Sequence, residues 1–159
     1  MVQTLNKLTS LAKTLNEKSD RANEIITSIN QRLAELSFGL EVWHENHFVS
    51  AGDTYYQNED EDMTGPEYFD VVLLGYYRFD DGWQLALKSG VIHRYIDAHY
   101  GSQVDEVTSS NRPTPLLKGS REERIRAMHL IPELLKQIED LAEGVIADID
   151  KAAEVASKL

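Results

Sequence analysis

The first third of the chain carries an apolar repeat that alternates between three-residue and four-residue steps. Residues 4–36 contain no glycine or proline, and nine of the ten repeat positions are apolar, which favours a helix over a strand. The repeat comprises Leu5, Leu8, Ala12, Leu15, Ser19, Ala22, Ile26, Ile29, Leu33 and Leu36. This heptad pattern predicts one long amphipathic helix over residues 4–36, with an apolar stripe that must be covered.

A second repeat of the same kind predicts a helix over residues 120–159. Ser120 and Glu123 have the spacing of a capping box, which marks a helix start. Because Pro132 cannot donate a backbone hydrogen bond, we expect a kink or a short break near Ile131. The repeat comprises Met128, Ile131, Leu135, Ile138, Ala142, Val145, Ile149, Ala152, Ala156 and Leu159.

The middle of the sequence, residues 39–117, is rich in aromatic and β-branched residues and predicts an antiparallel sheet. Its clearest unit is a hairpin over residues 68–89, with a turn at Asp80-Asp81-Gly82. Of two registers considered, a three-residue loop that pairs Phe79 with Trp83 gives the more apolar face. That face would carry Val71, Leu73, Tyr77, Phe79, Trp83, Leu85 and Leu87. Further strands are expected at residues 40–44 and 91–95.

Two long connections interrupt the predicted sheet. Residues 57–66 contain the run Glu59-Asp60-Glu61-Asp62 and are expected to form a mobile acidic loop, and residues 99–115 form the other connection. The whole pattern indicates a single α+β domain over residues 1–159, in which long N-terminal and C-terminal helices flank a small antiparallel β-sheet. The two stripes could cover each other in an antiparallel helix pair, or a second copy of the chain could cover them.

Composition excludes several classes of protein. The 159 residues include no cysteine, so disulfide frameworks, thiol chemistry and cysteine-bound zinc are excluded. A formal net charge of −11 disfavours direct nucleic-acid binding and binding to anionic membranes. No apolar run approaches the roughly 20 residues of a membrane span. The start of the sequence lacks the apolar core of a secretory signal, so we expect a cytoplasmic protein.

No motif in the sequence predicts catalysis. Phosphate-binding glycine motifs and a nucleophile elbow are lacking, and no acidic residue stands out as a general acid or base. His44 and His47 would point to opposite faces of a strand, which is poor geometry for a shared metal ion. We therefore expect no catalytic residue, no metal site and no cofactor.

A partner or ligand surface is the more plausible functional feature of the middle block. Aromatic rings and cations of the kind that interfaces favour occur together there. They are Trp43, Tyr55, Tyr56, Tyr76, Arg78, Lys88, His93 and Arg94. For Trp43 and Tyr76, packing within the sheet is the competing interpretation.

The leading hypothesis is a non-enzymatic interaction or assembly protein that self-associates, most simply as a homodimer, and presents a surface to an unknown protein partner. The helical seam would comprise Leu8, Leu15, Ile26, Ile29, Leu33, Leu135, Ile138, Val145 and Ile149. One alternative is an acidic inhibitor or nucleic-acid mimic that binds a basic groove, as the charge suggests. Another is a small-ligand binder or enzyme with a pocket between sheet and helices.

Overall fold

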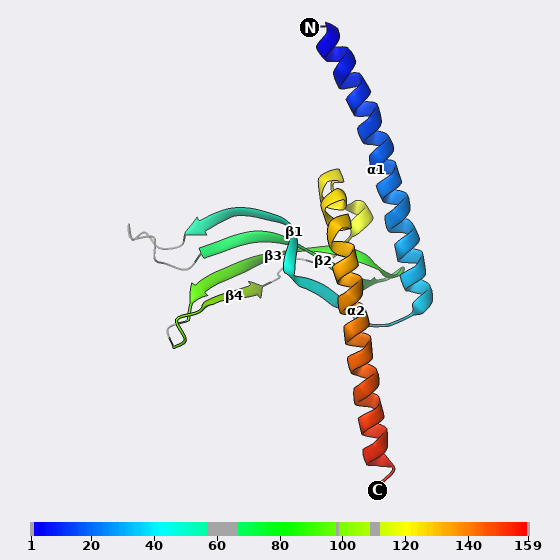
Figure 1. The fold of residues 1–159 in the computed structure, drawn as a ribbon, viewed down its shortest axis with the longest axis vertical. Helices are drawn as coiled ribbons and strands as arrows, with labels where there is room; N and C mark the ends of the chain where they lie inside the picture. Colours follow the sequence, from blue (N-terminus) through cyan, green and yellow to red (C-terminus); the bar gives the residue numbers. More distant parts are fainter. Residues whose placement is uncertain (1, 57–66, 98, 109–111, 159) are drawn as a thin grey trace.

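The computed structural model describes residues 2–56, 67–97, 99–108 and 112–158, with side chains for all of these except residues 45–47 and 53–56. Its elements are α1 (Val2–Leu36), β1 (Val42–Tyr56), β2 (Glu67–Phe79), β3 (Gly82–Ile96), β4 (Gln103–Thr108), β5 (Thr114–Pro115), the 3₁₀ turn η1 (Leu116–Lys118) and α2 (Arg121–Ala156). Figure 1 shows two long helices beside a curled antiparallel sheet. The predicted α+β architecture is confirmed.

Both helices are continuous, and their ends follow from local chemistry. α1 ends where Ser37 and then Gly39 adopt positive φ angles of 50° and 65°. α2 begins with the predicted capping box: the Ser120 hydroxyl accepts from the Glu123 amide, and the Ser120 amide donates to the Glu123 carboxylate at 2.7 Å. The break considered near Ile131 does not occur, because α2 runs through Pro132 without interruption.

Of the helices in the described residues, none combines the length and apolarity that a membrane span requires.

The four main strands form an antiparallel sheet in the order β1-β2-β3-β4, with β5 paired to β3. Residues 91–95, expected to form a separate strand, instead continue β3. β4 lies within residues 99–115, which were expected to be a connection without a strand. The acidic loop expected at residues 57–66 falls outside the described residues.

The register of the β2–β3 hairpin corrects the sequence-based prediction. Phe79 pairs with Gly82 and Tyr76 pairs with Leu85, so the turn consists of Asp80 and Asp81 alone. The prediction was wrong because residues 71–77 are apolar on both faces of β2, and burial could not select between registers that differ by one residue. The face towards the helices carries Val72, Leu74, Tyr76, Trp83, Leu85 and Leu87.

The main hydrophobic core lies between this face and the two helices. Ile26 and Leu33 come from α1, while Ile131, Leu134 and Ile138 come from α2. The Asn30 carboxamide in α1 accepts a hydrogen bond from the Leu85 amide at 2.8 Å, which fixes α1 onto β3. A buried tyrosine, Tyr76, stacks on Trp83 beneath the helices with ring centroids 5.3 Å apart.

Candidate interaction surfaces

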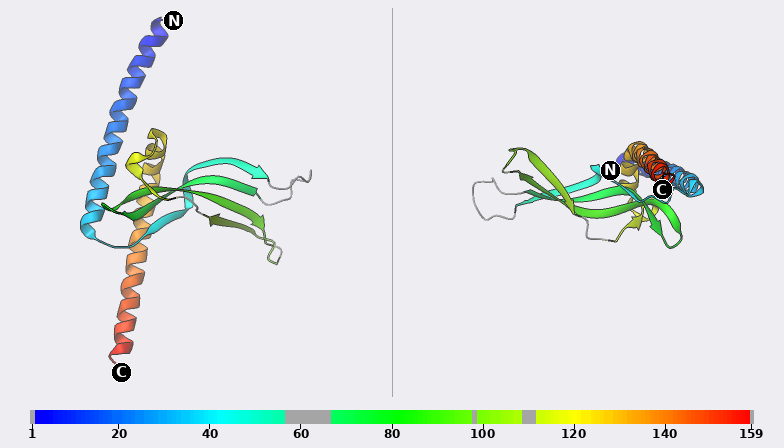
Figure 2. Two further views of the ribbon diagram at one scale, coloured as in Figure 1. Left: turned by 180° about the vertical axis from the view of Figure 1, so that it is seen from behind. Right: turned by 90° about the horizontal axis from the view of Figure 1, so that it is seen from below.

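The two helices run in the same direction and are displaced along their length. At one end of their overlap, Arg121 donates a hydrogen bond to Asn16 at 2.8 Å. At the other end, Leu33 and Ile138 line the same groove. Both pairs are separated by 105 positions in the sequence, so residues 16–36 of α1 lie beside residues 121–141 of α2. Figures 1 and 2 show this parallel, staggered arrangement, which overturns the expected antiparallel helix pair.

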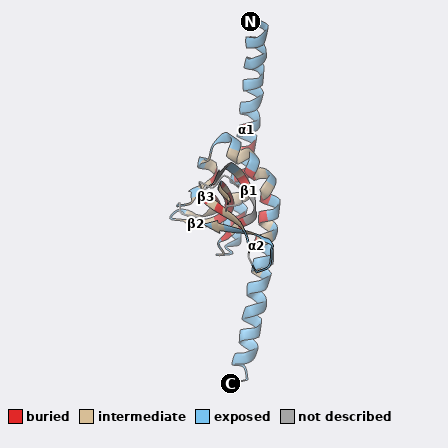
Figure 3. Ribbon diagram, turned by 90° about the vertical axis from the view of Figure 1, so that its left-hand side faces the viewer, coloured by how far each residue is buried: buried red, intermediate tan, exposed pale blue. Residues whose placement is uncertain are grey.

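The stagger leaves part of each helix without a neighbour in the chain. Residues 2–15 of α1, here called the α1 overhang, extend beyond the start of α2. Residues 142–156 of α2, the α2 overhang, extend beyond the end of α1. At 1.5 Å per residue these segments are about 21 Å and about 22 Å long. Figure 3 shows both overhangs as exposed helices that project from opposite ends of the buried centre.

Both overhangs carry large apolar side chains in water. Those of the α1 overhang are Val2, Leu5, Leu8, Leu11 and Leu15, which are 46–72% exposed. Those of the α2 overhang are Val145, Ile146, Ile149 and Val155, which are 37–62% exposed. They continue the heptad stripes that the overlap buries. Contiguous apolar surface of this kind is characteristic of a docking site.

The predicted helical seam is therefore divided between the overlap and the overhangs. Ile26, Leu33 and Ile138 are buried, and Ile29 and Leu135 pack against the core. Leu8, Leu15, Val145 and Ile149 lie on the overhangs and are exposed. Apolar repeat positions continue past the overlap on both helices, so the heptad pattern does not reveal where the intrachain contact stops.

An apolar groove marks the place where the overlap ends and the α2 overhang begins. Leu36 and Phe38 line it from the end of α1 and the following loop, while Ala142 and Ile146 line it from α2. Leu36 and Phe38 are 61% and 38% exposed, although they adjoin the core residues Leu33 and Ile138. The apolar surface is thus continuous from the core onto the α2 overhang.

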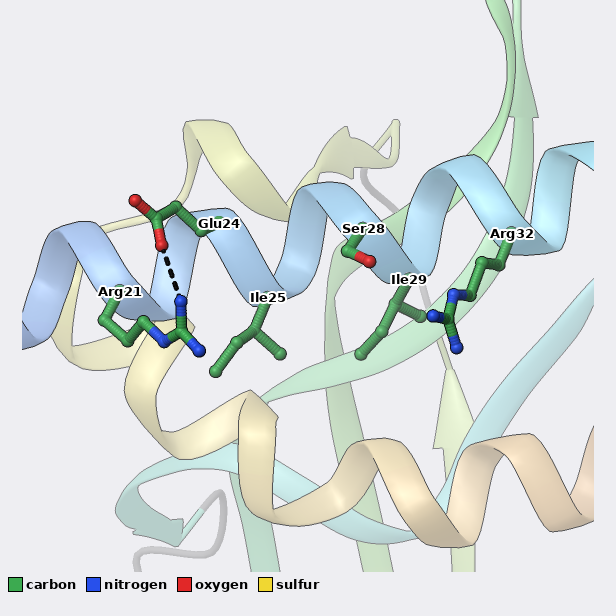
Figure 4. Close-up of a pocket in the computed structure, with 6 residues that line it drawn as sticks. All are labelled: Arg21, Glu24, Ile25, Ser28, Ile29 and Arg32. Carbon is green, nitrogen blue, oxygen red and sulfur yellow. Dashed lines mark hydrogen bonds and ion pairs between the residues drawn. The ribbon is translucent and has the colours of Figure 1, made fainter.

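A second groove follows α1 near the middle of the molecule (Figure 4). Its six lining residues all belong to α1: Arg21, Glu24, Ile25, Ser28, Ile29 and Arg32. Ile25 and Ile29 point towards α2, and Arg21 pairs with Glu24 at 3.0 Å. Both isoleucines are only partly covered. All six side chains come from one helix and the groove is open, whereas a small-molecule site is typically a concave pocket that encloses its ligand.

The sheet face away from the helices brings two predicted surface residues together. Trp43 lies on this face opposite Gly75, with the Lys88 ammonium 4.2 Å from its ring centroid. Tyr77 lies 6.0 Å from Trp43, and Phe79 lies 5.0 Å from Tyr77, between ring centroids. A Cβ atom at position 75 would lie 2.3 Å from the Trp43 ring, so this close approach requires glycine. Trp43, Tyr77, Phe79 and Lys88 are called the open sheet face below.

The other predicted surface residues lie elsewhere. Tyr76 is in the core, and burial raises the pKa of its phenol. Arg78 is exposed at the end of β2. His93 stacks on Tyr68 with centroids 4.7 Å apart, whereas Arg94 points to the opposite face. Tyr55 and Tyr56 belong to β1, and their side chains are outside the described set.

Arg94 is the centre of a small ionic cluster at the far end of the sheet. It donates to Asp105 at 2.9 Å and lies 3.8 Å from Glu67. The hydrogen bond from Arg94 lowers the pKa of the Asp105 carboxyl. On β3 and β4, Tyr95 donates to Glu106 at 2.8 Å, and this bond raises the pKa of the tyrosine. These paired side chains have the character of sheet-stabilising contacts.

His44 joins β1 to α2, a role that the sequence did not indicate. The ring is buried, and its Nε2 lies 3.1 Å from the Glu133 carboxylate. The two residues are 89 positions apart, so no local pattern could pair them. Within the described residues, no group of three or more histidine or acidic side chains is placed to hold a metal ion.

Comparison with known proteins gives one partial similarity. A stretch of 98 residues, 60% of this chain, is 26% identical to "Putative ATP-dependent helicase YeeB" of Bacillus subtilis (strain 168). The aligned stretch is 16% of that protein, so the chain spans less than a fifth of its length. No family model matches the chain. No solved structure matches it either.

Proposed function

We propose that this chain is a non-enzymatic assembly protein of the cytoplasm, which dimerises through its helices and presents its open sheet face to a protein partner. The observation that carries the proposal is the stagger of α1 and α2. It exposes nine large apolar side chains on two overhangs, while the sheet and the helix overlap form a closed core of their own.

Self-association accounts for overhangs that the chain alone does not cover. Each overhang extends a helix that is already nucleated in the overlap, but propagation by backbone hydrogen bonds alone gives little net stability in water. The overhangs gain little from the rest of their own chain, since nearly all their residues are exposed. Packing against another helix would supply the apolar burial that stabilises them.

The open sheet face supports the second half of the proposal. Trp43, Tyr77 and Phe79 are partly exposed, and Lys88 adds a cation over the indole. Aromatic rings with a nearby cation are enriched at the centres of interfaces.

Light scattering after gel filtration at micromolar concentration tests the assembly. We expect a discrete species of twice the 18.0 kDa chain mass. A monodisperse 18.0 kDa monomer would contradict self-association.

Affinity purification from the native host tests the open sheet face. Lys88→Glu should abolish recovery of a specific protein, whereas Lys118→Glu, on η1, should leave that recovery unchanged. Equal recovery with both variants would refute the role of that face.

A further inference from the structure

We propose that the dimer is a two-fold one in which the α1 overhang of each copy lies along the α2 overhang of the other. This inference rests on the function proposed above and specifies its interface. Pairing of unlike overhangs differs from the simpler scheme in which each overhang meets its own counterpart. Three features of the molecule favour it: length, charge and the position of the overhangs.

The two overhangs match in length and lie at opposite ends of the helix pair. α1 projects about 21 Å at one end, and α2 projects about 22 Å at the other. A two-fold rotation about an axis across the middle of the pair brings each α1 overhang level with an α2 overhang of the second copy. Both unlike pairs then form together and leave no free end, as in a closed symmetric dimer.

The charges of the overhangs are opposite. The α1 overhang contains Lys7 and Lys13 and no acidic residue, which gives a net charge of +2. The α2 overhang contains four acidic residues and Lys151, for a net charge of −3; the acids are Glu143, Asp148, Asp150 and Glu154. Unlike pairs therefore attract, while two α2 overhangs side by side would repel.

Partly covered apolar side chains lie where the two-fold axis of this dimer would pass. Each α1 residue in the overlap lies beside the α2 residue that comes 105 positions later in the sequence. The point halfway along the helix pair, between Val2 at one end and Ala156 at the other, therefore lies near Ile25 and Ile29 of α1. These two isoleucines line the groove of Figure 4 and are only partly covered within one chain. A copy related by the axis would approach this groove and bury more of their surface.

A complementation experiment with the full chain tests the pairing. Variant A carries Leu8→Gln and Leu15→Gln, which disable the α1 overhang, and variant B carries Val145→Gln and Ile149→Gln, which disable the α2 overhang. All four side chains are exposed, so each variant keeps the core intact. Glutamine is polar, uncharged and a good helix former, so the substitutions remove apolar surface while preserving charge and helix propensity.

Pairing of unlike overhangs makes a specific prediction for these variants. In A alone or B alone, every unlike pair contains one disabled overhang, so each variant should be monomeric at concentrations where the wild-type chain is dimeric. In an equimolar mixture, the intact α1 overhang of B can meet the intact α2 overhang of A. We therefore expect a heterodimer of A and B, detected by native mass spectrometry with one variant isotopically labelled.

The alternatives give different results. If like overhangs pair, A still dimerises through α2 and B through α1, and mixing yields no preferred heterodimer; that result overturns the inference while leaving the assembly function intact. A monomeric wild-type chain instead refutes the assembly function itself. A ladder of higher species would contradict the two-fold arrangement. The wild-type chain could instead be a monomer that binds anionic vesicles, with binding lost in variant A. The α1 overhang would then be a membrane-binding segment, and the proposal would be overturned.

A matched control excludes nonspecific effects of the substitutions. Ser10→Gln and Thr14→Gln alter the same helix at exposed positions outside the apolar stripe. This control should dimerise like the wild-type chain and should form homodimers without B. If it is monomeric as well, the dimer does not depend on the apolar stripe of the α1 overhang, and the inference is overturned.

Discussion

Arg121 donates a hydrogen bond to Asn16 across 2.8 Å, so the first residue of α2 lies beside the middle of α1. This contact fixes one end of the helix overlap, and the groove shared by Leu33 and Ile138 fixes the other. Together the two contacts define a parallel, staggered pair. The sheet, β5 and η1 all lie between the two helices in the sequence, and α2 begins beside Asn16 rather than at the end of α1. The apolar overhangs are a direct consequence of where α2 starts.

Substitution by alanine at two isoleucines of α2 should change the free energy of unfolding by different amounts. Ile138 is 2% exposed, so Ile138→Ala should destabilise the fold by about 2–5 kcal/mol at every protein concentration. Ile149 is 61% exposed, so Ile149→Ala should cost less than about 0.5 kcal/mol in the dilute monomer and more in the dimer. Urea unfolding at several concentrations measures both. A large, concentration-independent cost of Ile149→Ala would contradict its place on a free overhang.

Two glycines provide a matched test of the open sheet face. Gly75→Ala should destabilise the chain by about 1–3 kcal/mol and change tryptophan fluorescence, because the new Cβ meets the Trp43 ring. Gly144→Ala should stabilise α2 by about 0.5–1 kcal/mol, since nothing lies within 4 Å of the added methyl group. If the two substitutions have equal effects, Trp43 does not lie against Gly75.

Salt should weaken the dimer. The unlike overhangs carry net charges of +2 and −3, so screening should raise the dissociation constant severalfold between roughly 0.05 M and roughly 0.5 M salt. The apolar contacts should hold part of the affinity at high salt. Sedimentation equilibrium at each salt concentration measures this trend. Tighter association at high salt would contradict a dimer held by attraction between the oppositely charged overhangs.

The ionic cluster on β3 and β4 predicts a pH dependence of stability. Because Arg94 lowers the pKa of Asp105 in the folded chain, ionised Asp105 stabilises the fold above the unfolded value of 3.8, and this contribution is lost as pH falls through the lower folded pKa. Asp105→Asn should therefore be less stable than the wild-type chain near pH 7, and the difference should narrow in acid. A difference independent of pH would exclude the ion pair as its cause.

Much of the architecture was predictable from local patterns. The heptads located α1 and α2 to within a few residues, and Ser120 with Glu123 marked the start of α2. Both features depend on neighbouring side chains along one helix, so the sequence contains the whole signal.

Features that depend on long-range contacts were not predictable. The prediction of the β2–β3 register was wrong because residues 71–77 are apolar on both faces of β2. The direction and stagger of the helices depend on how the sheet returns the chain, and an even heptad pattern contains no mark at position 16 or 141. Likewise, the contact of His44 with Glu133 joins residues 89 positions apart. Sequence reasoning thus found the apolar stripes but could not say which half of each remains uncovered.

Hydrogen–deuterium exchange at two protein concentrations tests most directly whether a second copy covers the overhangs. At high concentration, amides of residues 2–15 and 142–156 should be protected, and they should lose protection on dilution, while residues 26–33 should stay protected throughout. Fast exchange of both overhangs at every concentration, or protection that dilution does not change, would contradict the account.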